Sequence, residues 1–127
     1  MTPVRTAFDA DAFAHAWISA WNAHDVDAIT GHYHHDIEYS SPFVAQLHGT
    51  ESLSGRDALR EYVAAGLDRY PDLYLGPIVT VAVGVESISI VYWSVNDLLA
   101  VETLVLDDDG RIIRAHCHYR ADVKSAP

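Results

Sequence analysis

The stretch SISIVYWSVNDLLAVETLVLDDDGRIIRAHCHY, residues 87–119, decides the fold of this chain. It contains three runs rich in Val, Ile, Leu and Tyr with a period of two, which is typical of β-strands. We expect strands over residues 87–95, 98–106 and 111–119, and another over 73–83. The string DDDG at 107–110 joins the last two strands, because Asp-Gly is a strong hairpin signal. The second half of the chain therefore predicts a mostly antiparallel sheet.

The first part of the chain carries its apolar residues at helical spacing instead. Phe13, Trp17 and Trp21 lie four residues apart and form one stripe, which predicts a helix that begins near Asp9 or Asp11. Aromatic residues at this spacing indicate a helix face that packs against a core.

Two shorter elements are expected next. Asp25 is a candidate N-cap for a second helix through residues 29 and 33, with Asp27 in the first turn, where the helix dipole favours a carboxylate. Residues 37–41 alternate before Pro42 and predict a short strand, since proline cannot donate to a sheet ladder. We expect a loop from there to Gly55.

A third helix is indicated by Ser54 and Asp57, which are spaced as in a capping box. Pro71 ends this helix because the residue before a proline is pushed out of helical space. The apolar positions of the helix are Leu59, Tyr62, Val63 and Leu67. Three helices followed by a mostly antiparallel sheet make an α+β fold, and the length predicts a single domain over residues 1–127.

Composition excludes several classes of partner. The 127 residues include 18 acidic residues against 8 Lys and Arg, for a formal net charge of −10, which argues against binding to nucleic acid or to an anionic membrane. Cys117 is the single cysteine, so neither an intrachain disulfide nor a Cys-based zinc site is expected. We find no signal-peptide pattern and no apolar run of the roughly 20 residues that span a bilayer. We therefore expect a cytoplasmic protein.

The predicted strands over 88–95 and 98–106 are apolar on both faces. An antiparallel sheet with two apolar faces needs a cover on each of them. Because the three helices can cover one face, we expect a homodimer in which the other face meets a second copy of the chain.

Four strings, taken in order, resemble the nuclear transport factor 2-like superfamily in its SnoaL-like branch. They are WNAHD at 21–25, YHHDIEYSSP at 33–42, SGRDAL at 54–59 and GRII at 110–113. The resemblance covers nearly the whole chain and implies a cystatin-like α+β cone, in which a curved sheet wraps around three N-terminal helices and an apolar pocket. Members of this superfamily include ketosteroid isomerase, epoxide hydrolases, polyketide cyclases, dehydratases and non-catalytic transport adaptors, so the fold alone does not fix the function.

The register that the resemblance implies points one set of side chains into this pocket. The strands contribute Ile37, Tyr39, Ser41, Glu102, Leu104, Leu106, Ile113, Ala115, Cys117 and Tyr119, and the helices contribute Trp17, Trp21, Tyr33, Tyr62 and Val63. Such a lining suits an apolar, ring-containing small molecule, and the same pattern also fits a filled core. The expected ligand contacts are Trp17, Trp21, Tyr33, Tyr39, Ser41, Tyr62, Cys117 and Tyr119.

Glu102 is the acidic residue that this register points inward. Desolvation should raise the pKa of such a carboxyl, and its position matches the protonated oxyanion-hole acid of ketosteroid isomerase. Glu102 is therefore the candidate catalytic residue, either as a protonated donor or as a general base. Two alternatives stay open, namely a polar ligand contact and a structural carboxyl paired with a Tyr, Trp or His.

Each named chemistry of the superfamily lacks a residue in this chain. Ser41 and Trp17 stand where ketosteroid isomerase has its general-base Asp and its oxyanion-hole Tyr, and neither side chain can shuttle a proton. Cys117 stands where the polyketide cyclases place an acid, and no inward Arg matches the epoxide hydrolases. Ketosteroid isomerisation is therefore not expected. A cofactor-free isomerase, cyclase or dehydratase, a non-catalytic carrier, and a dimeric interaction module stay open.

We expect the histidines of the second helix and of the last strand to have structural roles. His32, His34 and His35 fall at the expected end of the second helix, where the helix dipole favours cations. His116 and His118 alternate on the last strand and share the face that points away from the pocket, so no metal site is expected there. A register shift of one residue would bring both into the pocket and make His116 a candidate base. We expect no cofactor.

Overall fold

The computed structural model describes residues 8–120 of the chain. In order, its elements are α1 (Ala10–Asn22), α2 (Val26–Thr30), β1 (Tyr33–Ser40), α3 (Pro42–His48), β2 (Ser52–Ser54), α4 (Arg56–Arg69), β3 (Ile78–Gly84), β4 (Ser87–Trp93), the 3-10 turn η1 (Val95–Asp97), β5 (Leu99–Leu106) and β6 (Ile112–Tyr119). The strands form one sheet in the order β2-β1-β6-β5-β4-β3. Neighbouring strands are antiparallel except β1 and β6, which are parallel, so the predicted α+β fold is confirmed.

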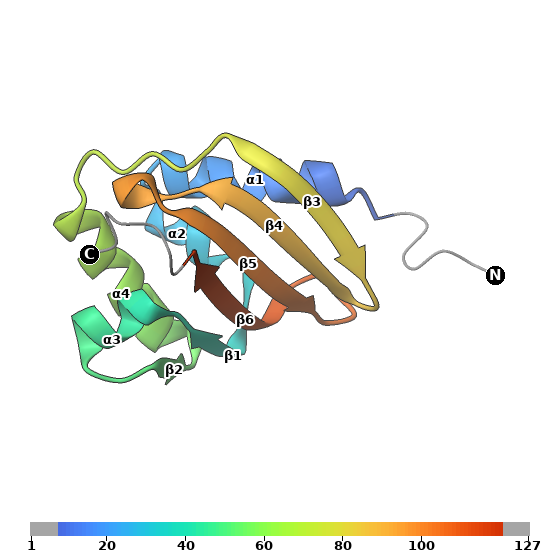
Figure 1. The fold of residues 1–127 in the computed structure, drawn as a ribbon. Helices are drawn as coiled ribbons and strands as arrows, with labels where there is room; N and C mark the ends of the chain where they lie inside the picture. The colour runs from blue at the N-terminus through green and yellow to red at the C-terminus, as the bar shows by residue number, and fades with distance from the viewer. Residues whose placement is uncertain (1–7, 121–127) are drawn as a thin grey trace.

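The helices gather on one side of the sheet. Figure 1 shows α1 and α2 behind strands β3–β6, with α3 and α4 at one end of the sheet. Alternate residues of β4 and of β5 are buried, and the Tyr92 ring of β4 contacts Trp17 of α1 with ring centroids 5.4 Å apart. Within residues 8–120, no helix has the length and apolar character needed to cross a membrane.

The first two helices begin where the sequence predicts. The Asp9 carboxylate accepts a hydrogen bond of 3.0 Å from the Ala12 amide, and the Asp25 carboxylate accepts one of 3.0 Å from the Ala28 amide. Each aspartate satisfies an amide that the first turn of a helix leaves unpaired. The expected end of the second helix is wrong, because α2 stops at Thr30 and Tyr33 already lies in β1, paired with β6.

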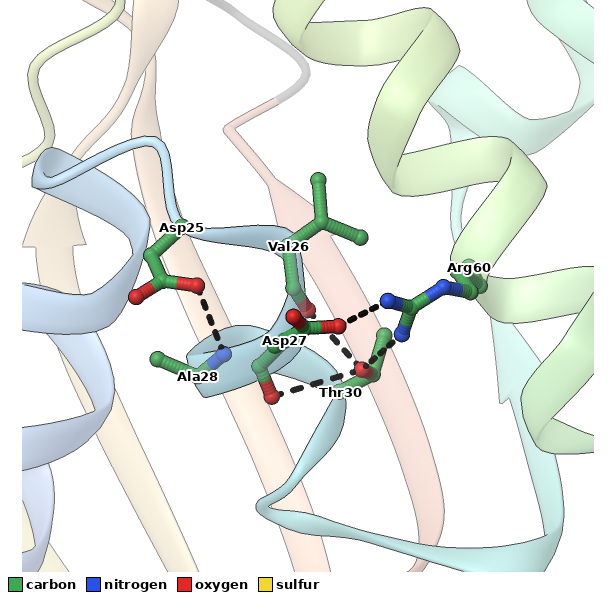
Figure 2. Close-up of polar contacts among 6 residues, drawn as sticks. All are labelled: Asp25, Val26, Asp27, Ala28, Thr30 and Arg60. Carbon is green, nitrogen blue, oxygen red and sulfur yellow. Dashed lines mark hydrogen bonds and ion pairs between the residues drawn. The ribbon is translucent and has the colours of Figure 1, made fainter.

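A polar contact fixes α2 to α4 (Figure 2). The Arg60 guanidinium donates to Thr30 Oγ1 at 3.0 Å through Nη1 and to the Asp27 carboxylate through Nη2. The Thr30 hydroxyl in turn donates to the Val26 carbonyl oxygen at 2.8 Å. One side chain of α4 therefore holds the last turn of the short helix in place.

The loop expected after Pro42 is instead largely ordered into α3 and β2. Ser41 caps α3, with its hydroxyl accepting from the Phe43 amide at 3.2 Å, and Pro42 occupies the first turn, where a missing amide costs nothing. The expected capping by Ser54 is also wrong. Gly55, with φ of 93°, is the N-cap of α4, and the Ser54 hydroxyl donates to Glu38 Oε1 at 2.8 Å.

The strand expected from residue 73 begins only at Ile78, because the preceding segment is tied to α1. The Asn22 side chain accepts from the Leu75 amide at 2.6 Å and donates to the Leu75 carbonyl oxygen at 2.9 Å. At the other end of the sheet, the predicted turn at 107–110 is confirmed by a 2.8 Å bond from the Asp107 amide to the Arg111 carbonyl oxygen.

The inward position expected for Ile113 is wrong. The pairing of β5 with β6 shifts between Val105 and Leu106, so that Ile112 pairs with Leu106. Ile112 is fully buried, and Ile113 is partly exposed on the other face. A bulge of this kind reverses the direction of the side chains that precede it, whereas Ala115 and Cys117, beyond the bulge, are buried as expected.

Candidate functional site

Glu102 lies in the middle of β5 and points inward. Every second residue of this strand from Ala100 to Leu106 is buried, and Glu102 is 1% exposed. An isolated carboxylate is costly at such a depth. The strand alternation therefore places an ionisable group among apolar side chains, as the sequence pattern indicates.

The two oxygens of this carboxyl group have different surroundings. The Tyr92 hydroxyl on β4 donates to Oε1 at 3.0 Å, whereas Oε2 is buried and has no hydrogen-bond partner among the described residues. Cys117 on β6 is the residue directly opposite Glu102 in the antiparallel pairing of β5 with β6. Burial raises the pKa of Glu102, and the facing Cys117 and Tyr92 side chains oppose that rise.

Glu102 lies at the wall of a partly open cavity of about 60 Å³. Its lining comes from α1, α3, α4, the segment after α4, and the sheet: Trp17, Trp21, Tyr39, Phe43, Leu47, Tyr62, Gly66, Tyr70, Leu73, Leu75, Tyr92, Ser94, Val95, Glu102 and Tyr119. Glu102 is the single carboxyl in this set, which contains no Lys, Arg or His. The volume holds several waters, so a ring-containing ligand requires side chains of the lining to move apart.

The structure brings most of the expected contact residues to this cavity. Six sequence-predicted site residues line it: Trp17, Trp21, Tyr39, Tyr62, Glu102 and Tyr119. Three others lie outside the lining: Tyr33, Ser41 and Cys117. Tyr33 is on β1 rather than on a helix and accepts a 3.0 Å hydrogen bond from the Trp17 indole. Ser41 caps α3.

Several lining residues were missed by sequence reasoning. Phe43 and Leu47 belong to α3, which was expected to be a loop, and Tyr70, Leu73 and Leu75 belong to the segment after α4. The position of Tyr92 near Glu102 could have been predicted from the strand pairing. It shares the inward parity of Ile90, which pairs directly with Glu102, so a hairpin register of β4 on β5 would have placed the two polar groups together.

The cavity wall is an aromatic network in edge-to-face or tilted contact. The ring centroid of Trp17 lies 5.4 Å from that of Tyr92 and 6.4 Å from that of Trp21. The ring centroids of Tyr39 and Tyr62 are 5.5 Å apart. Such pairs stabilise a fixed arrangement of rings. Burial raises the pKa of Tyr39, Tyr62 and Tyr92, so these phenols stay neutral at ordinary pH.

Two buried side-chain atoms of the described residues lack a hydrogen-bond partner, namely Trp21 Nε1 and Glu102 Oε2. Both residues line the same cavity. Buried polar atoms are nearly always paired in native proteins, with protein groups, water or a ligand. Two residues that line the cavity therefore each carry a buried polar atom whose hydrogen-bonding capacity is unused.

The histidines lie elsewhere. His116 and His118 are exposed, with Nδ1 of His116 2.8 Å from Ser40 Oγ and Nδ1 of His118 3.2 Å from the Val101 carbonyl oxygen, so they occupy the outward face as expected. The interpretation of His34 and His35 as helix-end residues is wrong, since both belong to β1.

His34 and His35 form a small polar cluster with Asp36, whose potential ligand atoms lie within 4.8 Å of one another. The Asp36 amide donates to His34 Nδ1 at 2.9 Å. This bond occupies the lone pair of the neutral ring, so Nε2 keeps the proton that a metal ligand must lose. The cluster is thus poorly arranged to hold a metal ion.

The sequence profile of the SnoaL-like domain matches residues 14–123, and the chain belongs to this family. A SnoaL-like protein of unknown function from Burkholderia thailandensis has 36% sequence identity and a TM-score of 0.87, over 94% of this chain and 100% of that one. Chain and relative therefore share the fold over nearly their full lengths.

More distant structures share the fold. SalBIII, an epoxide hydrolase/cyclase-like enzyme of pyran ring formation in salinomycin, has 18% identity and a TM-score of 0.70, over 88% of this chain and 91% of that one. A cystatin-fold protein from Novosphingobium aromaticivorans has 17% identity and a TM-score of 0.70, over 87% and 98% of the two chains. A comparison with curated proteins gives no match.

Proposed function

We propose that this protein binds an apolar small molecule in the cavity beside Glu102, and that the protonated carboxyl group of Glu102 contacts the polar group of that molecule. The observation that carries the proposal is the buried, unpartnered Oε2 atom of Glu102, which is the single carboxyl residue in the lining of a mainly aromatic and aliphatic cavity. A buried polar atom without a partner costs about 1–3 kcal/mol. A bound molecule that satisfies Oε2 recovers part of that free energy.

The arrangement supports proton-transfer chemistry without a cofactor. In a dehydration, the Glu102 O–H bond breaks as its proton moves to a leaving hydroxyl of the substrate, and water departs as the C–O bond breaks. The carboxylate then takes a proton from an adjacent carbon, whose C–H electrons form the double bond, and Glu102 is protonated again. An isomerisation starts instead from the ionised carboxylate of Glu102, which takes a proton from one carbon of the substrate and then returns it to another.

A non-catalytic carrier is the second candidate function. It is favoured by the composition of the lining, in which Glu102 is accompanied by phenols whose pKa is raised. Most reactions of this kind use a second group to stabilise charge or to accept a proton. A carrier needs only the apolar wall and a polar contact.

Glu102→Gln separates the two functions because glutamine keeps the shape and can still donate a hydrogen bond but cannot exchange a proton. Wild type and variant are incubated with 1-indanone in D₂O, and ¹H NMR follows loss of the protons beside the carbonyl. An enzyme of the proposed kind accelerates this exchange, and the variant binds the ketone without acceleration. Binding without exchange in either protein indicates a carrier. Equal acceleration by both proteins would exclude Glu102 as the proton-transfer group.

We further propose that the outer face of the sheet meets a second copy of the chain. No described helix covers this face of β4 and β5 (Figure 1). It presents short apolar and hydroxyl side chains, including Ser89, Val91, Val101 and Thr103. Sheet faces with such side chains pack face to face with another sheet, and the commonest symmetric partner is the same face of an identical chain.

A further inference from the structure

The second unpartnered atom of the cavity, Trp21 Nε1, narrows the class of ligand. Resting on the proposed function, we infer that the ligand is a neutral apolar molecule with an acceptor oxygen, such as a ketone, and that Trp21 Nε1–H and Glu102 Oε2–H donate to its polar end. Trp21 is thus a specificity-determining residue of the site.

The structure separates Trp21 from Trp17, its neighbour one helical turn away. Both indoles line the cavity. Trp17 Nε1 donates to the Tyr33 hydroxyl at 3.0 Å, whereas Trp21 Nε1 is buried without a partner. Trp21 therefore carries the unpartnered indole N–H of α1, whereas the resemblance places Trp17 where ketosteroid isomerase has its oxyanion-hole Tyr.

Both unpartnered atoms of the site act as donors. An indole N–H donates and never accepts. At Glu102, Oε1 already accepts from the Tyr92 hydroxyl, so the proton of the neutral acid belongs on Oε2. Two unpartnered donors call for a ligand oxygen that carries lone pairs, and a hydrocarbon ligand leaves both unsatisfied.

The charge of the lining excludes an anionic ligand. No Lys, Arg or His is among the residues that line the cavity, and a buried carboxylate or phosphate without a cation is strongly destabilised. A cationic ligand would face the Trp21 N–H donor and would require the ionised form of Glu102, which burial disfavours. A neutral carbonyl oxygen satisfies the donors at the smallest desolvation cost.

Matched probes test this inference. Wild-type protein is titrated with 1-indanone and with indane, which has the same rings without the oxygen, and ligand-observed NMR gives both dissociation constants. We expect the ketone to bind about three- to ten-fold more tightly, as one or two net hydrogen bonds allow. We also expect the indole N–H signal of Trp21, assigned with Trp21→Phe, to move downfield on ketone binding while that of Trp17 does not.

Trp21→Phe keeps an aromatic ring and removes the N–H group. In this variant the preference for the ketone over indane should fall, with the affinity for indane little changed. Trp17→Phe is the matched control and should keep the preference. Equal affinity for both probes in wild type would overturn the inference and leave apolar binding intact, whereas binding of neither probe would overturn the proposed function as well. Preference retained in Trp21→Phe would remove Trp21 from the site.

Discussion

The Tyr92 hydroxyl and Oε1 of Glu102 are joined by a 3.0 Å hydrogen bond between neighbouring strands of the sheet. Tyr92 is 3% exposed and Glu102 is 1% exposed. The bond engages Oε1 of the carboxyl group, and Oε2 is buried without a hydrogen-bond partner among the described residues. The candidate site is therefore defined by the Tyr92–Glu102 pair rather than by Glu102 alone.

Replacement of Tyr92 by Phe should remove this bond and leave Oε1 of Glu102 without its hydrogen-bond donor. We expect a loss of about 1–3 kcal/mol in the free energy of unfolding, measured by urea denaturation near neutral pH. Tyr74→Phe is the control, since Tyr74 is 73% exposed and the change should stay within about 0.5 kcal/mol. Equal effects of the two substitutions would show that the Tyr92 bond contributes nothing.

The stability of the fold should depend on the protonation of Glu102. Burial raises the pKa of this group above its ordinary value, so the folded state binds the proton more tightly than the unfolded chain. The stability relative to Glu102→Gln is therefore greatest below the ordinary pKa and declines as pH rises through the folded-state pKa.

Urea denaturation of both proteins from about pH 4 to about pH 9 measures this dependence. The other titrating groups are shared, so the difference between the two curves isolates Glu102. A difference that does not change with pH, or that grows in favour of the wild type at high pH, would contradict a buried neutral acid.

The contact between α2 and α4 gives a structural prediction outside the site. Thr30 is 3% exposed, and its hydroxyl both donates to Val26 and accepts from Arg60. Thr30→Val keeps the shape and should cost about 1 kcal/mol in the free energy of unfolding. Glu61→Ala, at an exposed position of α4, serves as the control, and an equal loss in both variants would deny the contact a specific role.

The proposed dimer depends on the outer face of the sheet. Val101→Lys places a charge opposite Val91 on that face, and we expect sedimentation to show a dimer for the wild type at micromolar concentration and a monomer for the variant, with unchanged circular dichroism. Val85→Lys changes a residue that is 79% exposed in the turn after β3 and should leave the dimer intact. A wild-type monomer at that concentration would end the dimer proposal.

The sequence was most informative where side chains alternate without interruption. The alternation along β5, with the register that the resemblance implies, predicted the inward position of Glu102, and the Asp carboxylates at residues 9 and 25 predicted two helix starts. The alternation and the two caps depend on residues close together in the chain, so local patterns suffice for them, whereas the choice of the inward face depended on the resemblance.

The misses have two kinds of cause. Pairing with β6 drew Tyr33 into a strand rather than a helix, and the hydrogen bonds of Asn22 to Leu75 kept residue 73 outside β3. Both contacts join residues that are far apart in the chain, so sequence spacing does not report them. The bulge in the hairpin of β5 and β6 displaced Ile113 from the expected inward position, and an alternating pattern of apolar residues does not mark where such a bulge falls.

The central claim, that Glu102 is a buried neutral acid at the wall of a ligand cavity, is tested most directly by infrared difference spectroscopy. The carboxyl C=O stretching band of the wild type at pH 7 is compared with that of Glu102→Gln. We expect a protonated-carboxyl band that the variant lacks and that shifts when 1-indanone binds. A carboxylate band in its place at pH 7, unaffected by the ketone, would contradict the account.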